Sequence, residues 1–221
     1  MSVAVDPDFD APAEEGAAVS WRTWAACGLM LLATALNYMD RQALAQQGRD
    51  VQAELKLTNE DYGNLEFWFG IAFAVGGVAT GFLVDGFSLR WLYPAILLGW
   101  SAVGFLTGGA ASYRELLTYR VLLGFFEAGQ WPCAVAASQR LLSRGNRAMG
   151  NSILQSGASL GAILTPLVVL ALNTGGMGGW RTPFRVIGAL GVAWVVAWLL
   201  MDRPRALDAP ETPAEAGKAG D

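Results

Sequence analysis

Six apolar segments, each close to the length of a bilayer-crossing helix, constrain this chain more than any other feature of its sequence. A helix needs about 20 predominantly apolar residues to cross the hydrocarbon core of a bilayer. Backbone N–H and C=O groups in lipid must bond to one another, and these segments are too long for barrel strands. The sequence therefore predicts an all-α membrane protein with six transmembrane helices, over residues 21–46, 62–84, 91–111, 116–142, 148–172 and 183–201.

The composition agrees with a membrane protein, since 53% of the 221 residues are hydrophobic and 15% are charged. The sequence has no histidine, which excludes Ser-His-Asp and Cys-His catalysis, His-ligated zinc and axial-His haem. Its two cysteines, Cys27 and Cys133, lie far apart in apolar segments and are too few for a thiolate metal cluster. A net charge of −4 without a basic stripe argues against nucleic acid as a partner. We expect no enzyme, no metal and no other cofactor.

The two ends of the chain differ in composition from the middle. Residues 1–20 contain five acidic residues and no Lys or Arg, and residues 204–221 combine proline, alanine and acidic residues. These stretches are predicted to be a disordered leader and a disordered tail around a six-helix domain over 21–203. The loop 140–147 places three arginines on one side of the membrane. The positive-inside rule then favours a multi-pass protein of the inner (cytoplasmic) membrane with both termini cytoplasmic.

Two pairs of charged residues lie well within predicted membrane segments: Asp40 and Arg41 in the first segment, and Arg120 and Glu127 in the fourth. An ionised side chain at the centre of a bilayer costs at least about 2.5–3.5 kcal/mol, so such groups face a cavity or a partner. Arg120 and Glu127 are seven residues apart and share one helix face, whereas the adjacent Asp40 and Arg41 diverge by roughly 100°. If the first helix runs outward and the fourth inward, Asp40 and Arg120 reach similar depth. A network of two carboxylates and two guanidinium groups is then expected.

This network has two interpretations. Its ion pairs could only lock two helices together, or they could form a substrate and proton pathway. Arg41 and Arg120 offer planar forks suited to a carboxylate. Without histidine, a proton relay has to use Asp40 and Glu127, which could load and release a proton during a cycle. Glu66, at the outer end of the second segment, is expected to lie at the membrane interface rather than in a cavity.

Several sequence motifs carry a family resemblance. They are the run 37–42 (Asn-Tyr-Met-Asp-Arg-Gln), the run 120–132 (Arg-Val-Leu-Leu-Gly-Phe-Phe-Glu-Ala-Gly-Gln-Trp-Pro), the basic loop 140–147, Asp61-Tyr62-Gly63 and Trp180-Arg181. The first two resemble the first-helix and fourth-helix signatures of the anion:cation symporter branch of the major facilitator superfamily, which includes hexuronate, galactonate and sialin-like transporters. The resemblance covers about 20–205, and it corresponds to the N-terminal half of such a transporter.

The resemblance implies half of the major facilitator fold, built as two three-helix inverted repeats. It also implies roles for individual residues. Those that match Tyr38 and Arg41 help to hold the substrate carboxylate, and Gln130 stands where relatives often have Asn. The family residues that match Asp40 and Glu127 are protonation sites, and the family residue that matches Arg120 couples to them. The implied substrate-binding set is thus Tyr38, Arg41, Arg120 and Gln130, and the proton-coupling set is Asp40 and Glu127.

Two regions depart from the pattern of the family. The loop between the second and third helices keeps only Gly81, Asp85 and Arg90 of a longer motif that latches the two halves of a transporter together, so the usual latch is expected to be absent. Relatives often carry Gln and Tyr where this chain has Gly70 and Phe73. These departures argue against recognition of sugar-acid hydroxyl groups.

The sequence supports two functional hypotheses. The first is a half-size secondary transporter (a symporter) of a small organic anion, a sugar acid or another carboxylate, coupled to protons and working as a dimer or with a separate C-terminal half. The second is a non-transporting structural or accessory subunit of a larger membrane complex, derived from a transporter half. The expected partners are the lipid bilayer, a small carboxylate, protons, and a second copy, a second half or a larger membrane complex.

Overall fold

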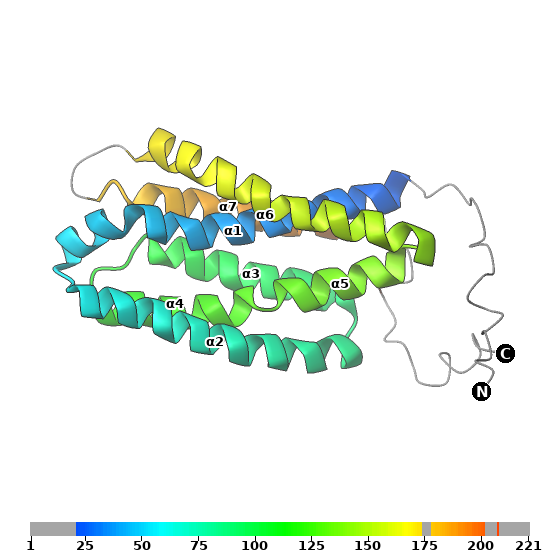
Figure 1. Ribbon diagram of the computed structural model, residues 1–221, viewed down its shortest axis with the longest axis horizontal. Helices are drawn as coiled ribbons and strands as arrows, with labels where there is room; N and C mark the ends of the chain where they lie inside the picture. The colour runs from blue at the N-terminus through cyan, green and yellow to red at the C-terminus, as the bar shows by residue number, and fades with distance from the viewer. Residues whose placement is uncertain (1–20, 174–177, 202–206, 208–221) are drawn as a thin grey trace, which may run out of the picture.

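A computed structural model describes residues 21–173, 178–201 and 207. Over these residues it contains helices and no strand (Figure 1). The helices are α1 (Trp21–Leu55), α2 (Asn59–Gly86), α3 (Leu89–Thr107), α4 (Tyr113–Glu127), α5 (Gln130–Leu141), α6 (Arg144–Leu172) and α7 (Arg181–Leu200). The predicted leader, and the predicted tail apart from Leu207, lie outside the described residues.

Six membrane crossings account for these helices, as the sequence predicts. Helices α2, α3, α6 and α7 are each long and apolar enough to cross a bilayer. The helix α1 is 35 residues long and carries the charged pair Asp40 and Arg41. Helices α4 and α5 are 15 and 12 residues long and lie end to end, so together they make one crossing (Figure 1).

The break between α4 and α5 corrects the prediction of one uninterrupted fourth helix. It falls at Ala128 and Gly129, directly after Glu127. Pro132 has no N–H to donate to the carbonyl of Ala128 four residues earlier, and its ring crowds that carbonyl. The chain therefore tightens at this point, where Gly129 N–H donates to the carbonyl of Phe126, three residues back, at 3.1 Å. The break places Glu127 at a helix end in the interior of the bundle.

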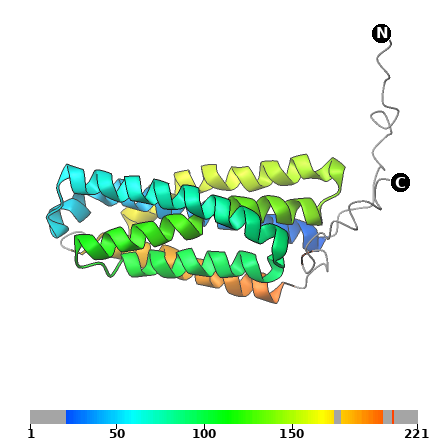
Figure 2. The same ribbon diagram turned by 90° about the horizontal axis from the view of Figure 1, so that it is seen from below.

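The packing of the helices has an internal symmetry. The most extensive contacts are between α1 and α6, between α2 and α4, and between α3 and α7 (Figures 1 and 2). An inverted repeat relates α1 to the α4–α5 pair, α2 to α6, and α3 to α7. The repeat therefore maps the α1–α6 contact onto the α2–α4 contact, and it maps the α3–α7 contact onto itself. The observed packing is the one that two three-helix repeats require.

Glycines allow the backbones of paired helices to touch. A Cβ atom added at Gly76 of α2 would overlap the carbonyl oxygen of Phe125 in α4, and one at Gly124 of α4 would lie 2.5 Å from the carbonyl oxygen of Phe69 in α2. Small residues of this kind let membrane helices approach closely, because packing rather than water exclusion holds them together. The α2–α4 contact therefore depends on Gly76 and Gly124.

The same substitution at two glycines of α2 should change stability in opposite directions. Gly76→Ala forces backbone movement against Phe125 and should destabilise the fold by about 1–3 kcal/mol. Gly63→Ala adds a Cβ atom that meets nothing within 4 Å and should stabilise the helix by up to about 1 kcal/mol. Denaturant unfolding in mild detergent measures both. Equal effects would contradict the close α2–α4 contact.

Glu54 joins three elements at one end of the bundle, beyond the predicted first membrane segment. Its carboxylate accepts hydrogen bonds from Trp180 Nε1 at 2.8 Å and from Gly178 N–H at 2.8 Å, and it pairs with Arg181 Nη1 at 2.6 Å. Arg181 Nη2 also donates to the carbonyl of Ala110 at 2.7 Å. The end of α1, the start of α7 and the turn after α3 are therefore fixed together by the Glu54–Arg181 pair.

Glu54→Gln should lower stability in a pH-dependent way. Partial burial raises the pKa of Glu54, but the hydrogen bonds from Trp180 and Gly178 and the charge of Arg181 outweigh it, so the pKa lies below its ordinary value. A lowered pKa stabilises the folded state above the unfolded-state value of about 4.3 and ceases to do so as pH falls through the folded-state value. The stability difference between wild type and Glu54→Gln should therefore be constant near pH 7 and shrink below about pH 4.3. A difference independent of pH would contradict this role.

Candidate functional site

The charged residues of the first and fourth crossings meet in the interior of the bundle. Arg41 donates from Nε and Nη2 to Oε2 of Glu127, at 3.3 and 3.2 Å. The side chain of Glu127 is fully buried, whereas that of Arg41 is 34% exposed. Asn37 Nδ2 donates to the backbone carbonyl of Glu127 at 3.3 Å, next to the helix break. The arginine thus joins a buried carboxylate to an accessible side of α1.

A second ion pair joins Glu66 to the charge cluster. Arg120 Nη2 donates to Oε1 of Glu66 at 2.7 Å, and the side chains are 1% and 44% exposed, respectively. Glu66 is therefore a partner of a buried arginine, which its expected position at the membrane interface did not indicate. Its position could have been inferred from the need of Arg120 for a counter-charge, because Glu127 is already close to Arg41. The expected network of two carboxylates becomes one of three.

Asp40 lies on the inner side of this cluster. It is 1% exposed and interacts electrostatically with Glu127 and Arg120. A Cβ atom built on Gly104 of α3 would lie 3.0 Å from Asp40 Oδ1, so Asp40 points toward α3 and away from the accessible side. Within the part of the chain that the structure describes, Asp40 Oδ1, Glu127 Oε1 and Arg120 Nε and Nη1 have no hydrogen-bond partner. The cluster can therefore form more hydrogen bonds than its present pairs use.

Aromatic rings of α2 separate and cover the two arginines. The guanidinium carbon of Arg120 lies 4.3 Å from the ring centroid of Phe69, and that of Arg41 lies 5.3 Å from the same ring. The guanidinium of Arg41 also lies 4.6 Å from Phe73 and 5.8 Å from Tyr38. Ring faces attract cations, most strongly where water is excluded. Sequence reasoning missed Phe69 because its role depends on two arginines from other helices.

The amide nitrogen of Gln130 donates to Thr34 rather than to a residue of the charge cluster. Gln130 is 1% exposed, and its Nε2 donates to Oγ1 of Thr34 in α1 at 3.0 Å. The hydroxyl of Thr34 in turn donates a hydrogen bond to the backbone carbonyl of Met30 at 3.0 Å. In this structure Gln130 therefore ties α5 to α1.

The residues of the predicted loop motif lie where α2 gives way to α3. Gly81 and Asp85 belong to the last turns of α2, and Arg90 belongs to the first turn of α3. The guanidinium carbon of Arg90 lies 5.3 Å from the ring centroid of Trp91. Asp85 is exposed. The carbonyl of Val84 accepts a hydrogen bond from Nη2 of Arg140, at 3.2 Å, so the basic loop 140–147 is connected to the end of α2.

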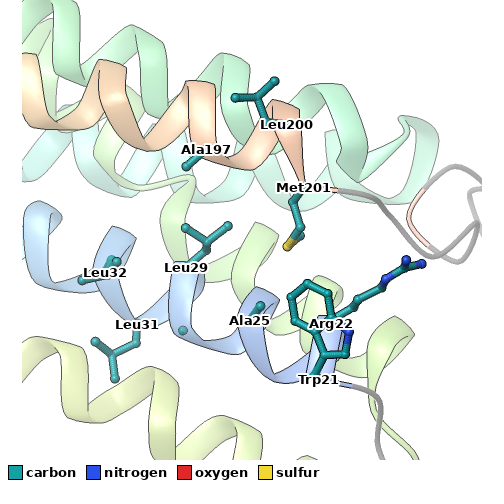
Figure 3. Close-up of a pocket in the computed structure, with 10 residues that line it drawn as sticks. Trp21, Arg22, Ala25, Leu29, Leu31, Leu32, Ala197, Leu200 and Met201 are labelled. Atoms are coloured by element: carbon teal, nitrogen blue, oxygen red, sulfur yellow. The ribbon is translucent and has the colours of Figure 1, made fainter.

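A separate groove of about 910 Å³ opens between the start of α1 and the end of α7 (Figure 3). Its lining is apolar except for Arg22 at the edge, and none of the buried charged residues lines it. The lining residues are Trp21, Arg22, Ala25, Gly28, Leu29, Leu31, Leu32, Ala197, Leu200 and Met201. Such a lining fits an apolar group better than a small anion.

Among the described residues, no group of three or more Cys, Asp or Glu is arranged to hold a metal ion. The charge cluster is the candidate site.

Comparison with known proteins identifies the family. Residues 30–220 match the Major Facilitator Superfamily. The chain belongs to this superfamily. A bacterial homologue of the human lysosomal transporter Spinster, solved facing inward and unoccupied, has the same fold, with a TM-score of 0.78 at 22% identity over 91% of this chain and 48% of that one. The predicted fold, half of a major facilitator transporter, is confirmed.

Similar curated proteins are named as transporters. The probable sulfoacetate transporter SauU of Cupriavidus necator is 30% identical over 179 residues, which cover 80% of this chain and 41% of that protein. The hexuronate transporter of Escherichia coli K12 is 27% identical over 178 residues, which cover 80% of this chain and 40% of that protein. The chain thus spans less than half the length of these two relatives. Both names agree with the predicted resemblance and with the expectation of a multi-pass membrane protein that is not an enzyme.

Proposed function

We propose that this chain forms one half of a proton-coupled transporter for a small organic anion that carries a carboxylate. The observation that carries the proposal is the pair between Arg41, which is one-third exposed, and Glu127, which is fully buried. Two relatives are named as transporters of sulfoacetate and of hexuronate, which are small organic acids. A guanidinium with an accessible edge can bind such an acid through two parallel hydrogen bonds.

Competition for Arg41 would couple the substrate to a proton. In the described pair, Glu127 holds Arg41 through a single oxygen. A proton that neutralises Glu127 removes the charge attraction and releases Arg41 for the carboxylate of the substrate. Loss of that proton restores the pair and expels the substrate. Asp40 and Arg120 interact electrostatically with Glu127, so they sense the same change.

A complete transport cycle needs a second six-helix bundle opposite this one, because the substrate site of the fold lies between two bundles. We place α1 and α2 on the side that faces it, since these helices carry the accessible side chains of Arg41 and Glu66. The basic loop 140–147 supports an inner-membrane orientation with both termini cytoplasmic.

Binding measurements test the proposal directly. The native particle that contains the chain, purified in mild detergent without removing its partners, is titrated calorimetrically with a panel of carboxylates between pH 5.5 and 8, in two buffers of different ionisation enthalpy. At least one carboxylate should bind, more tightly at the lower pH, with net proton uptake. Absence of binding across the panel, or binding without proton uptake, would contradict proton-coupled transport.

The alternative, a non-transporting structural subunit, is favoured by the loop that keeps only Gly81, Asp85 and Arg90 of the family motif. Native mass spectrometry of the particle extracted in mild detergent separates the two functions. Two copies, or one copy with a second six-helix bundle, support the transporter. A large assembly of many unrelated chains supports the structural subunit and contradicts the transporter.

A further inference from the structure

Resting on the proposed function, we propose that the substrate is a carboxylate with an aromatic or alkyl body rather than a polyhydroxylated one. The α2 side of the site determines this preference. There the accessible guanidinium of Arg41 is bordered by aromatic rings and by an open glycine position, and these surfaces suit an apolar body. The two α2 positions concerned are Phe73 and Gly70.

The rings fix how a substrate can approach Arg41. Phe73 and Phe69 stand 4.6 and 5.3 Å from the guanidinium carbon, and the two rings stack on each other at 5.9 Å with an interplanar angle of 26°. Phe69 is almost fully buried, whereas Phe73 is partly exposed. A carboxylate that binds the accessible edge of Arg41 therefore places its body beside Phe73.

Gly70 leaves space next to that ring. Glu66, Gly70 and Phe73 follow one another at spacings of four and three residues, so they share one face of α2. Gly70 is exposed, and a Cβ atom built there meets nothing within 4 Å. A flat or narrow group can occupy this space between the Glu66 carboxylate and the Phe73 ring.

The α2 side of the site presents few hydrogen-bonding groups to the hydroxyl groups of a substrate. Neither glycine nor phenylalanine has a side-chain donor or acceptor, and Glu66, an acceptor only, already pairs with Arg120 through Oε1 at 2.7 Å, which leaves Oε2 as the acceptor on this face. The amide nitrogens of Asn37 and Gln130 donate to the Glu127 carbonyl and to Thr34. A hydroxyl group that leaves water without gaining a partner loses free energy, whereas apolar surface gains it on burial. The site should therefore discriminate against a substrate with several hydroxyl groups.

Two monocarboxylates of opposite body chemistry test the preference. The native particle that contains the chain, purified in mild detergent with its partners, is titrated with phenylacetate and with D-galacturonate at the same pH. Phenylacetate should bind at least about tenfold more tightly. Gly70→Gln, which has space for its side chain, should weaken phenylacetate binding by about tenfold and strengthen galacturonate binding. Gly86→Gln, at the far end of α2 and also without atoms within 4 Å of its Cβ position, is the matched control and should leave both affinities unchanged.

The outcomes separate this inference from the proposed function. Galacturonate binding that equals or exceeds phenylacetate binding would overturn the substrate preference and leave carboxylate binding intact. Equal effects of Gly70→Gln and Gly86→Gln would also overturn it, because the preference would then not arise at α2. If neither compound binds and the rest of the carboxylate panel fails too, the proposed function itself is wrong.

Discussion

Arg41→Ala should greatly weaken carboxylate binding at the charge cluster. Arg41 is the accessible guanidinium of the charge cluster, whereas Arg120 is buried and engaged by Glu66. Hydrogen bonds to charged groups contribute about 1.5–3 kcal/mol, so the affinity should fall by about 10- to 100-fold or more. Calorimetric titration with the tightest-binding carboxylate measures the loss.

Two further variants make the result specific. Arg49→Ala removes an exposed arginine two turns further along α1 and should leave the affinity unchanged. Arg41→Lys keeps the charge but loses the planar fork, so it should bind more weakly than wild type and more tightly than Arg41→Ala. An affinity that survives Arg41→Ala would place the substrate elsewhere and remove the main support for the proposed function.

Arg120→Ala should have the largest effect on stability. The side chain of Arg120 is 1% exposed, pairs with Glu66, stacks on Phe69 and interacts electrostatically with Asp40. Removal of one partner of a buried ion pair typically costs about 3–5 kcal/mol, because the remaining charges are left without compensation. Unfolding in denaturant measures this loss in the purified chain. The matched control is Arg114→Ala, which removes an exposed arginine from the first turn of the same helix and should change little.

A double substitution tests the electrostatic origin of that loss. Glu127→Gln removes a buried negative charge that interacts with Arg120. If uncompensated charge causes the instability, Arg120→Ala combined with Glu127→Gln should be less destabilised than the sum of the two single variants. Strict additivity would show that Arg120 acts through packing against Phe69 instead.

Arg120→Ala also discriminates between the two functions. A transporter that tolerates the destabilisation should still insert but lose uptake or proton coupling, because Arg120 interacts with both buried carboxylates, Asp40 and Glu127. A purely structural subunit should instead lose assembly or expression. Membrane insertion and native mass, measured alongside proton uptake on binding, distinguish these results.

The sequence alone determined the fold class and the number of crossings. Hydrophobic stretches of spanning length leave helices as the only solution, because every backbone polar group in lipid must be satisfied within its own segment. The cost of placing charge in a membrane likewise singles out Asp40, Arg41, Arg120 and Glu127 as side chains that need a cavity or a partner. These constraints act on each segment separately, so a linear pattern reveals them.

Only the tertiary structure decided which charges pair and which surfaces they face. The pairs Arg41–Glu127 and Arg120–Glu66 join side chains 86 and 54 residues apart, and the packing of α2 against α4 brings Glu66 to Arg120. Phe69 lies beside both arginines because Gly124 lets the α2 backbone approach α4. Such contacts depend on helix rotation and close backbone approach, which arise from packing between segments and leave no periodic pattern within any one of them.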